Sequence, residues 1–542
     1  MLGTNACRIT VRSNGRGPAG RNGGLGRALH QRAGGGRGSL MKHIALCAAL
    51  TSFAAALPAA AKPATAANGS TAAASDETTD DITLPQGVPA HVYQTLAAAA
   101  LELGSGTIWY VVDDRNVLDW DRPSLRSRLT GESWRYDNNT FWMNFAGHPL
   151  FGSGVYAVAR DSHSGIFFSF LASFLTSMAW EFGIEYNERV SINDVIFTPI
   201  TGVALGEFAH KLGFYLSSHP RESVGRTALG WALTPLTRAS HLTCAGEPTR
   251  GYAPDSLGYM SGLWHEFYVD YALSGVRATG ADESVVQQLR LGGSFSGLPN
   301  YRSPGHTSRA FYHGEISRLG LRLEKSTQGA GVAVVTDTTL AGYAHRSIAD
   351  DGVGHSHAFG VAVGYGYENT YAAGLDERKS WVGFPGLAID TYWASRKLSS
   401  ELSLRAYPVF GGASSPAFPR YRAQTPGQTF KTVLTREGYF YGFGLVGQLQ
   451  ARQRFGMLSN EFSLRAEPMW SSQGLDRDQA KVTDDTAARD VVLEVSARTS
   501  LALGHSVVLG VEASSQKRES RAGDVRLRLS RQSLGLFLGS RF

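Results

Sequence analysis

Cysteine is almost absent from this chain of 542 residues, which contains only three. Cys7 and Cys47 precede residue 62, in a region that the sequence predicts to be removed, so Cys244 alone would remain. A single cysteine excludes an internal disulfide framework. Long apolar runs are also lacking after residue 216, where no stretch reaches the roughly 18 residues of a membrane-spanning helix. This absence argues against a polytopic inner-membrane protein.

The excess of basic residues is confined to the N-terminal end. The chain has 52 Lys and Arg against 46 Asp and Glu, but seven arginines and Lys42 precede residue 62, with no acid among them. Without these eight residues, 44 bases stand against 46 acids. A protein that binds nucleic acid usually carries a basic surface. We therefore expect no nucleic-acid partner.

A secretory signal peptide is predicted at residues 41–61, "MKHIALCAALTSFAAALPAAA". It has a short positive start, an apolar run too short to span a membrane, and a small-residue cleavage pattern. We interpret Met41 as the start and residues 1–40 as an extension assigned in error; a genuine disordered basic tail is the alternative. Residues 62–88, rich in Ala, Thr, Ser and Asp, are a predicted disordered linker.

The last strand of the chain ends in the pattern of an outer-membrane barrel protein. In "SLGLFLGSRF", Leu534, Leu536 and Leu538 alternate with small or polar residues, and Phe542 is a terminal aromatic. Ser540 departs from the usual apolar residue at its position. This ending resembles the signal by which the barrel-assembly machinery recognises outer-membrane β-barrels, so we expect that machinery as a partner.

Residues 256–542 alternate apolar and polar side chains with period two, as transmembrane barrel strands do. One example is "YFYGFGLVGQLQAR", whose aromatic end fits an interfacial girdle. We expect about twelve strands, and ten or fourteen remain open; closure leaves no unpaired backbone edge in lipid. The predicted segments are 257–275, 284–297, 309–324, 331–347, 355–370, 380–396, 401–412, 437–453, 460–472, 489–503, 506–518 and 525–542.

The polar faces of these strands carry charges of both signs. "ELSLRAYP" (401–408) and "EFSLRAEP" (461–468) are near copies, each with Glu and Arg four residues apart and therefore on one face. Charges cannot face lipid, so they would project inward as an acid–base ladder. A soluble two-sheet sandwich with a charged surface is the alternative. The expected lumen residues are Glu401, Arg405, Glu461, Arg465, Glu467, Glu494 and Arg498.

Residues 89–220 are predicted to form a small helical domain, followed by a connecting segment over 221–255. Helices are expected over "AHVYQTLAAAALELG", 167–188 and 192–216. The second has a polar stripe at every fourth residue, from Ser169 through Ser173 and Ser177 to Glu181 and Glu185, which needs an interior partner. The stripe would also let this apolar run pass through the inner membrane without being retained. "SIND" at 191–194 starts the third helix with a capping pattern, so an antiparallel helical hairpin is expected.

This region resembles a bacterial family, the outer-membrane Domain of Unknown Function 3943 family. The resemblance rests on "NFAGHPLFGSGVYAVAR" (144–160), "WEFGIEYNE" (180–188) and "SINDVIFTPITGVALGE" (191–207), and covers roughly residues 135–216. It implies a secreted outer-membrane protein with a C-terminal barrel. The family carries no established activity, so the resemblance implies a class of protein and no chemistry.

Candidate chemistry lies in a polar cluster of the helical domain. Glu207-x-x-His210 has the spacing of a carboxylate-bridged metal motif, but a di-iron bundle needs two such motifs and two further Glu. No G-x-S-x-G nucleophile elbow is present. We therefore expect no metal and no cofactor. The candidate cluster is Asn144, His148, Arg160, Glu181, Glu185, Asp194, Glu207 and His210.

A structural role for this cluster is the preferred interpretation. Buried acids and bases commonly satisfy one another, and a pair between Arg160 and Glu181 or Glu185 would fix the packing. His148 is expected in a polar turn before a Gly152–Gly154 loop.

The sequence thus predicts an α+β protein: a C-terminal antiparallel transmembrane β-barrel of about 12 strands, preceded by a small helical domain containing an antiparallel helical hairpin. A helix is about 10–12 Å across and the lumen is crowded by charges, so we expect the helices beneath or beside the barrel, facing the periplasm or lying at the membrane. The expected location is the Gram-negative outer membrane, with its lipids as partners. The preferred function is structural, or passing or binding a small or lipidic solute. The alternative is a lipid-modifying enzyme that uses the Glu/His cluster.

Overall fold

The computed structural model describes residues 91–113, 121–221, 223–243, 252–280, 282–372, 375–504 and 506–542. The predicted N-terminal extension, signal peptide and linker lie outside the described residues, as does Cys244.

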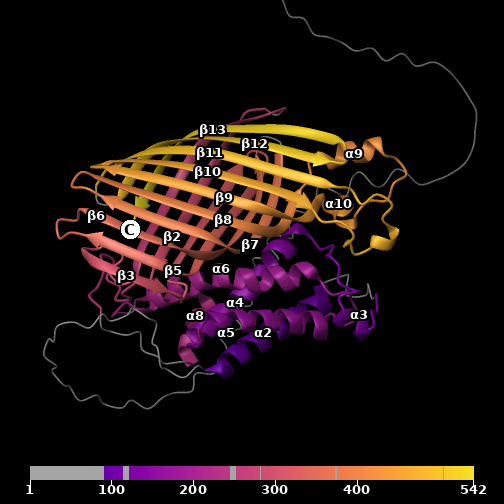
Figure 1. Cartoon of the computed structure of the whole chain (residues 1–542), viewed down its shortest axis with the longest axis horizontal. Helices are drawn as coiled ribbons and strands as arrows, with labels where there is room; N and C mark the ends of the chain where they lie inside the picture. Colours follow the sequence, from indigo (N-terminus) through magenta and orange to yellow (C-terminus); the bar gives the residue numbers. More distant parts are fainter. Residues whose placement is uncertain are drawn as a thin grey trace, which may run out of the picture. The chain divides into compact units, whose positions relative to one another are not determined.

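Twelve antiparallel strands close into a barrel, which confirms the predicted fold class (Figure 1). The ring closes where β5 (Ala330–Ile348) pairs with β6 (Gly354–Ala372), and β1 (Trp264–Ala278) pairs with β13 (Val525–Arg541). The other members are β2 (Ser284–Ser296), β4 (Ile316–Ser326), β7 (Leu375–Ala394), β8 (Leu398–Ser414), β9 (Tyr439–Phe455), β10 (Leu458–Ser471), β11 (Ala488–Ala502) and β12 (Val507–Ala522).

A short extra strand, β3 (Gly305–Phe311), corrects the third predicted segment. β5 pairs with β4 along its first half and with β3 along its second half. The predicted strand at 309–324 is therefore interrupted at residues 312–315. Lys211 of the helical domain donates a hydrogen bond to the carbonyl of Gly314 in this interruption, so the break is a contact point for a helix.

The two ends of the barrel differ. At the long-loop end, β8 and β9 are joined by residues 415–438, with α9 (Phe418–Gln424) and α10 (Thr432–Arg436), and β10 and β11 by residues 472–487, with the 3₁₀ turn η4 (Gln479–Lys481). At the short-turn end, β1 begins, β13 ends, and short turns join β5 to β6, β7 to β8, and β9 to β10, while the longer connection 297–315, which contains β3, joins β2 to β4.

The helical domain consists of seven α-helices and two π-helical turns within the described residues. They are α2 (Val92–Asp113), α3 (Leu125–Leu129), η2 (Met143–Gly147), α4 (His148–Asp161), α5 (Ile166–Ala179), η3 (Trp180–Ile184), α6 (Ile192–Ser217), α7 (Val224–Leu233) and α8 (Pro235–Thr243). Ser191 caps α6 by accepting a hydrogen bond from the Asp194 backbone N–H at 3.4 Å, in the geometry expected from "SIND".

Three of these helices differ from the sequence interpretation. His148 begins α4, and Gly152 and Gly154 lie inside that helix, so the predicted polar turn and loop are wrong. The connecting segment at 221–255 contains α7 and α8. Gly152, which suggested a loop, lies in close contact with α6.

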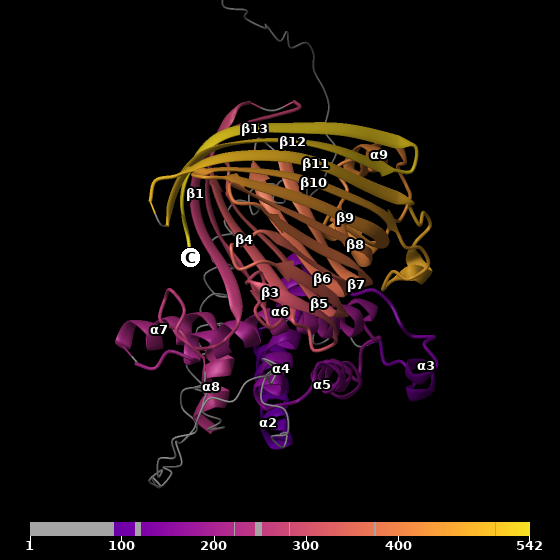
Figure 2. The ribbon, with the colours of Figure 1, turned by 60° about the vertical axis from the view of Figure 1, so that its left-hand side comes forward.

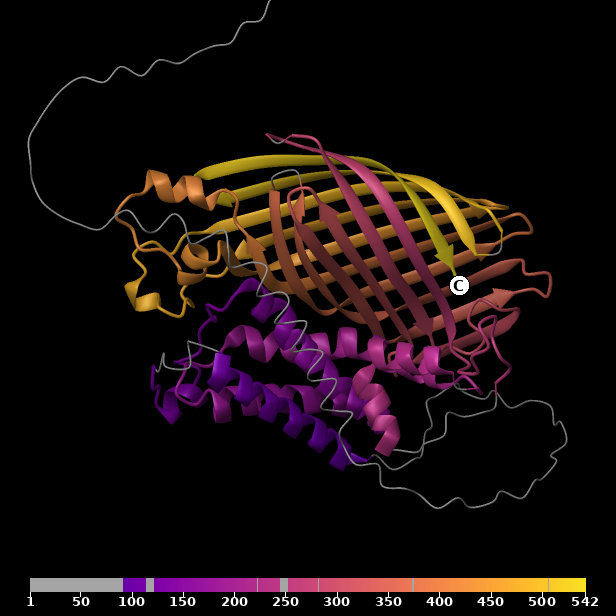
Figure 3. The same ribbon diagram turned by 180° about the vertical axis from the view of Figure 1, so that it is seen from behind.

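α6 lies against the outer side of the barrel wall, and α4, α5 and α2 lie beyond it (Figures 2 and 3). Phe197 near its start packs on Phe410 of β8, and Tyr215 near its end packs on Phe267 of β1, with ring centroids 5.8 and 5.5 Å apart. One row of residues runs across the barrel wall from β8 to β1, and each residue in it is the direct pairing partner of the next. The row is Phe410, Val382, Tyr365, Thr336, Leu319, Gly293 and Phe267.

This row means that α6 crosses the strands at right angles. Six strand spacings of about 4.8 Å amount to about 29 Å. The helix rises about 27 Å between Phe197 and Tyr215 at about 1.5 Å per residue. The two lengths are similar, and α6 contacts β4, β5, β6 and β7 along its length, with aromatic contacts to β8, β2 and β1 through Phe197, Phe208 and Tyr215.

Aromatic side chains fill the interface between the helices and the wall. Tyr439 and Tyr441 of β9 are 0% and 3% exposed, and Phe145 of η2 packs on both with centroids 5.5 Å away. The predicted interfacial girdle at this end of β9 is therefore wrong: these rings lie under the helical domain. Phe443, two residues further along the strand, stays 51% exposed.

Candidate functional site

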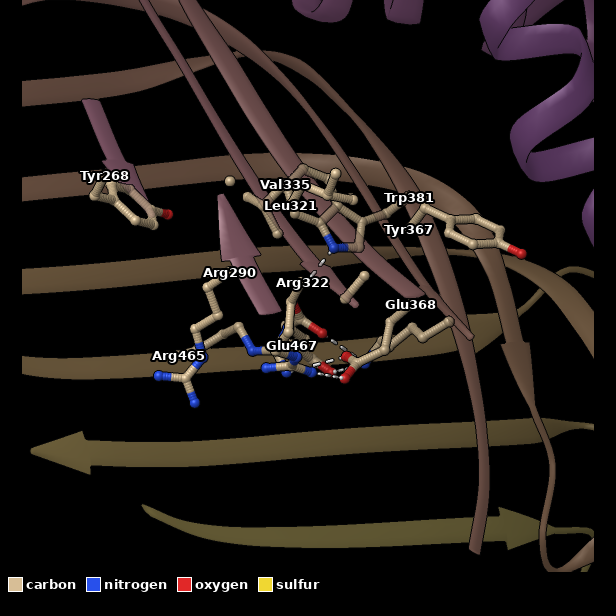
Figure 4. Close-up of a pocket in the computed structure, with 14 residues that line it drawn as sticks. Tyr268, Arg290, Leu321, Arg322, Val335, Tyr367, Glu368, Trp381, Arg465 and Glu467 are labelled. Atoms are coloured by element: carbon tan, nitrogen blue, oxygen red, sulfur yellow. Dashed lines mark hydrogen bonds and ion pairs between the residues drawn. The ribbon is translucent and has the colours of Figure 1, made fainter. Parts of the chain in front are cut away.

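Ion pairs bridge the lumen of the barrel from wall to wall. Glu368 of β6 accepts from Arg322 of β4 at 2.8 Å and from Arg465 of β10 at 3.2 Å, and Arg465 also reaches Glu494 of β11 at 2.7 Å (Figure 4). A cavity of about 220 Å³ lies beside this bridge, and Glu467 is the fifth charged residue of the group.

All seven predicted lumen residues lie in such pairs, mostly with partners on other strands rather than on their own. Arg405 binds Asp337 at 2.8 Å and Asp390 at 2.9 Å. The remaining pairs join Glu401 to Arg302, Glu461 to Arg452, Glu467 to Lys379, and Arg498 to Asp270. The sequence reasoning missed most of these partners, although all of them except Arg302, which lies in the turn between β2 and β3, are on strands of the barrel.

An apolar cap lies at the long-loop end of the barrel. It consists of Phe418 of α9, Phe430 just before α10, and Leu434 of α10, which are buried in one cluster with Phe440 of β9 and Met469 of β10. Side-chain contacts join the two long connections, residues 415–438 and 472–487, beside this cluster. Lys431 pairs with Asp485 at 2.7 Å. Tyr421 donates to Asp484 at 2.8 Å, and this hydrogen bond to a carboxylate raises the pKa of Tyr421.

The candidate polar cluster of the helical domain separates into two groups. Nearer the short-turn end, Arg160 of α4 binds Glu207 of α6, with Nε and Oε2 2.8 Å apart. Tyr156 donates to the same oxygen at 2.9 Å, and Lys211 lies 3.6 Å from Oε1. The expected pair of Arg160 with Glu181 or Glu185 is wrong, because α4 and α6 run parallel and bring Arg160 beside Glu207.

His210 belongs to the same level of the bundle but has other partners. Its Nδ1 contacts the carboxylate of Asp161, which also accepts from Ser240 of α8 at 3.2 Å. Glu207 and His210 therefore contact different residues, Arg160 and Asp161, rather than a common site. Among the described residues, no group of three or more His, Cys, Asp or Glu side chains is arranged to hold a metal ion.

The second group lies nearer the long-loop end. Asn144 donates to the hydroxyls of Tyr439 and Tyr441 at 2.9 and 2.6 Å, and Asn193 donates to Asn144 at 3.3 Å. Glu181 accepts from the Ser191 backbone N–H at 2.6 Å. Glu185, the last member of the predicted polar stripe, is half-buried at the end of η3.

Asp137, a residue that the sequence analysis did not single out, connects this group to the barrel. It lies 3.8 Å from Arg477 in the β10–β11 connection. Burial, together with the charge of Asp194, raises the pKa of Asp137 to about 7, while Arg477 opposes the shift. No periodicity marks such a loop residue, so the sequence offers no signal for it.

The serines of the polar stripe hold α5 against its neighbours. Ser173 donates to the carbonyl of Gly152 at 3.1 Å, and Ser177 donates to the carbonyl of Asp194 at 3.0 Å. The stripe thus faces α4 and α6, with α5 antiparallel to α6.

A small, mainly apolar cavity of about 60 Å³ lies where α2, α4, α5 and α6 meet. His148 and Asp194 line it, with Nε2 and Oδ1 3.6 Å apart. Among the described residues, His148 Nε2 and Glu102 Oε2 are buried and make no hydrogen bond there. The other lining side chains include Leu103, Trp109, Met143, Phe151, Thr176 and Trp180.

Comparison with known proteins gives a family match for the helical domain and fold likenesses for the barrel. Residues 133–236 match the model of a domain of unknown function, DUF3943. No curated protein matches the chain.

Solved outer-membrane barrels are similar to about half of the chain. The NanC porin is 9% identical, over 49% of this chain and 98% of its own, with a TM-score of 0.21. The translocator domain of the autotransporter NalP from Neisseria meningitidis is 13% identical, over 52% and 88%, with a TM-score of 0.20. A Pseudomonas aeruginosa FadL homologue is 8% identical, over 55% and 94%, with a TM-score of 0.19. Likenesses at this level bear on the barrel fold alone.

Proposed function

We propose that this chain is an integral protein of the Gram-negative outer membrane, that its barrel is a closed scaffold rather than a channel, and that its helical domain binds a lipidic solute. The single observation that carries the proposal is the charged bridge through the lumen formed by Arg322, Glu368 and Arg465.

The outward faces of the strands support the membrane location. Leu534, Leu536 and Leu538 of β13 are 69%, 63% and 55% exposed, while charged side chains turn inward. Outer-membrane barrels have short periplasmic turns and longer extracellular loops. The short-turn end would therefore face the periplasm. We also propose that the barrel-assembly machinery recognises β13 and Phe542.

Two barriers support a closed lumen. The charges of the bridge are partly buried, with side chains 11–28% exposed, and separating them would leave each without its counter-charge, which is unfavourable. The apolar cap around Phe418 and Leu434 adds a second barrier at the long-loop end. A hydrophilic solute would have to displace both.

The cavity among the helices favours a lipidic ligand. Its lining is mainly apolar, with a few polar groups at His148, Asp194 and Glu102. Ligand sites commonly combine apolar walls with a few polar groups that fix orientation. At about 60 Å³ the cavity is far smaller than the roughly 300–1,000 Å³ of a drug-sized ligand pocket, so it would hold only a short segment of an acyl chain, with the rest of the chain outside it.

Conductance in planar bilayers tests the closed lumen. The purified wild-type protein is expected to insert without producing current steps at either polarity. Reproducible single-channel steps from the wild type would overturn the proposal.

Lipid that co-purifies with the protein tests the cavity. Thr176→Phe places a ring in the cavity, whereas Leu175→Phe adds one at the neighbouring position, which is 54% exposed. Native mass spectrometry is expected to show loss of bound lipid for T176F and retention for L175F. Equal lipid occupancy in both variants would contradict a ligand in this cavity.

An enzymatic role is the second candidate, because His148 and Asp194 lie close together beside an apolar cavity. Lipid profiles of cells producing wild type, His148→Ala and, as a control outside the cavity, His219→Ala would test it. Lipid modification requires a change with H148A alone; identical profiles would exclude it.

A further inference from the structure

The exposed faces of α2 and α5–η3 have no charge among the side chains that the structure describes. Every exposed residue of these helices whose side chain the structure describes is apolar, Tyr or Gly. They are Val92, Tyr93, Leu96, Ala97, Ala100, Gly104, Ile108, Val111 and Val112 of α2, and Phe167, Phe168, Leu175, Ala179 and Gly183 of α5–η3.

Polar residues of the same helices point inward instead. Gln94 and Thr95 of α2 and Ser169, Ser173 and Ser177 of α5 are at most 9% exposed. A helix at the surface of a soluble protein has the reverse distribution, with its polar face outward. This inverted pattern indicates that the medium around α2 and α5 is apolar.

The two helices have the length of membrane spans. Val92–Val112 and Ile166–Ile184 contain 21 and 19 residues, and only 17% and 22% of their most apolar windows are buried. About 20 apolar residues cross the hydrocarbon core of a bilayer. The core helix of a soluble protein would be mostly buried, which excludes that explanation here.

The helical domain extends between the two ends of the barrel. Beside the start of α6, the Tyr136 backbone N–H donates to the carbonyl of Leu475 in a long loop, at 2.8 Å. Beyond its end, the Met260 backbone N–H donates to the carbonyl of Ser218, just before β1. A barrel that spans a bilayer therefore places these helices at bilayer depth.

The packing within the domain is of the kind found between helices in membranes. A Cβ on Gly152 would lie 2.1 Å from the carbonyl oxygen of Thr198, and one on Gly202 would lie 3.0 Å from that of Gly152. Gly206 approaches the carbonyl of Ser153 equally closely. Gly-x-x-x-Gly spacing brings the helix backbones together where apolar burial cannot drive association.

We infer that the helical domain is embedded in the lipid bilayer beside the barrel, with α2 and α5 covered by acyl chains of membrane lipids. Their apolar surface continues the outward belt of the barrel, so lipid covers both without a water-filled gap. The inference rests on the proposed membrane location of the barrel, and goes beyond it by placing α-helices in the same membrane.

Quenching of a fluorescent label by lipid or by water-soluble ions tests this placement in the full chain. Single cysteines labelled with a small fluorophore would be placed at Ile108 of α2 and Leu175 of α5, in a background without the native cysteines, and reconstituted into phosphatidylcholine vesicles. Leu273→Cys on the outer face of β1 reports lipid, and Glu283→Cys in the charged β1–β2 turn reports water; these two positions are 49% and 66% exposed.

The expected result is that labels at Ile108 and Leu175 lose most of their fluorescence to a nitroxide-bearing lipid and little to iodide, as at Leu273. Quenching by iodide at both positions, with Leu273 still quenched by lipid, would overturn the inference and leave the barrel location intact. Protection from both quenchers would also overturn it, in favour of a second copy of the chain. Iodide quenching at Leu273 would instead contradict the proposed function.

Discussion

Buried charges in this protein occur in sets that neutralise one another. In the helical domain, Glu207 lies between Arg160 and Lys211, and all three side chains are at most 7% exposed. Removing one member of such a set leaves another buried charge without its partner, which costs about 3–5 kcal/mol, whereas apolar replacement of both can be nearly neutral. This asymmetry gives a test of which residues act as a unit.

Glu207→Leu is expected to destabilise the folded protein by about 3–5 kcal/mol, because Arg160 loses its counter-charge. Arg160→Met combined with Glu207→Leu is expected to recover much of that loss. Urea unfolding in detergent micelles, followed by tryptophan fluorescence, measures both changes.

Exposed charges provide the control for this experiment. Arg277 and Glu283 pair on the surface with side chains 73% and 66% exposed, so Glu283→Leu is expected to cost little. Additive losses from Arg160→Met and Glu207→Leu would contradict a coupled pair.

Asp137 introduces a pH dependence at the long-loop end. Its pKa of about 7 lies above the value of about 3.9 for an unfolded chain. Protonated Asp137 therefore favours the folded state, and this contribution is complete below the unfolded pKa and is lost as the pH rises through about 7.

Asp137→Asn is expected to remove this loss of stability at rising pH. The melting temperature of the variant should therefore fall less than that of the wild type between about pH 5 and about pH 8. Circular dichroism melts in detergent at both values measure the difference. Asp121→Asn, which removes another carboxylate near Arg477, is expected to keep the wild-type dependence. Parallel pH profiles of D137N and wild type would exclude Asp137 as the source.

The residues of the candidate site were predictable by type but not by partner. The polar stripe placed Glu181 on an interior face, as the structure does. It does not determine which turn of one helix lies beside which turn of another. That register is set by the parallel packing of α4 on α6, which the sequence analysis did not predict because it treated residues 148–154 as a turn and loop.

At the scale of elements, strands were easier to predict than helices. Alternation in lipid-facing strands is a local pattern, and eleven of the twelve predicted segments each correspond to one strand of the barrel. The exception, 309–324, is divided by the contact with Lys211, a residue about one hundred positions away. α4 was missed because its Gly and Pro residues are typical of loops in water. In this bundle, Gly152 allows α4 and α6 to approach closely.

The glycines of α4 and α6 give a test at this scale. Gly152→Ala would put a methyl group 2.1 Å from a backbone oxygen of α6, so the two helices would have to separate. Overpacking of this kind typically costs about 1–3 kcal/mol. The expected result is a lower urea midpoint than wild type.

Gly104→Ala is the matched control, because no atom lies within 4 Å of the added methyl group on α2. It is expected to leave stability unchanged or raise it by about 0.5–1 kcal/mol, since Ala favours a helix over Gly. Similar losses in both variants would mean that the effect of Gly152→Ala comes from helix propensity and not from contact.

At the scale of the whole molecule, the proposed ligand site lies in the helical domain outside the barrel. A barrel of twelve strands can hold a water-filled lumen, but here ion pairs cross the lumen and an apolar cluster is buried at one end. The helices pack on the outer wall, where lipid would otherwise lie. The sequence established the crowded lumen but left the helices either beneath or beside the barrel, because helix-to-wall contacts depend on side chains far apart in the chain.

The two barriers in the lumen act in series, and this leads to the last prediction. The double variant with Arg322→Ser and Arg465→Ser removes the charged bridge but leaves the cap of Phe418, Phe430 and Leu434 in place. It is therefore expected to remain non-conducting. Replacing residues 416–436 by a short Gly/Ser turn removes the cap and leaves the bridge. Only the combination is expected to give current steps in planar bilayers. A heat-modifiable band on gels would establish that each variant is folded, and steady conductance from the cap deletion alone would mean that the ion pairs do not seal the lumen.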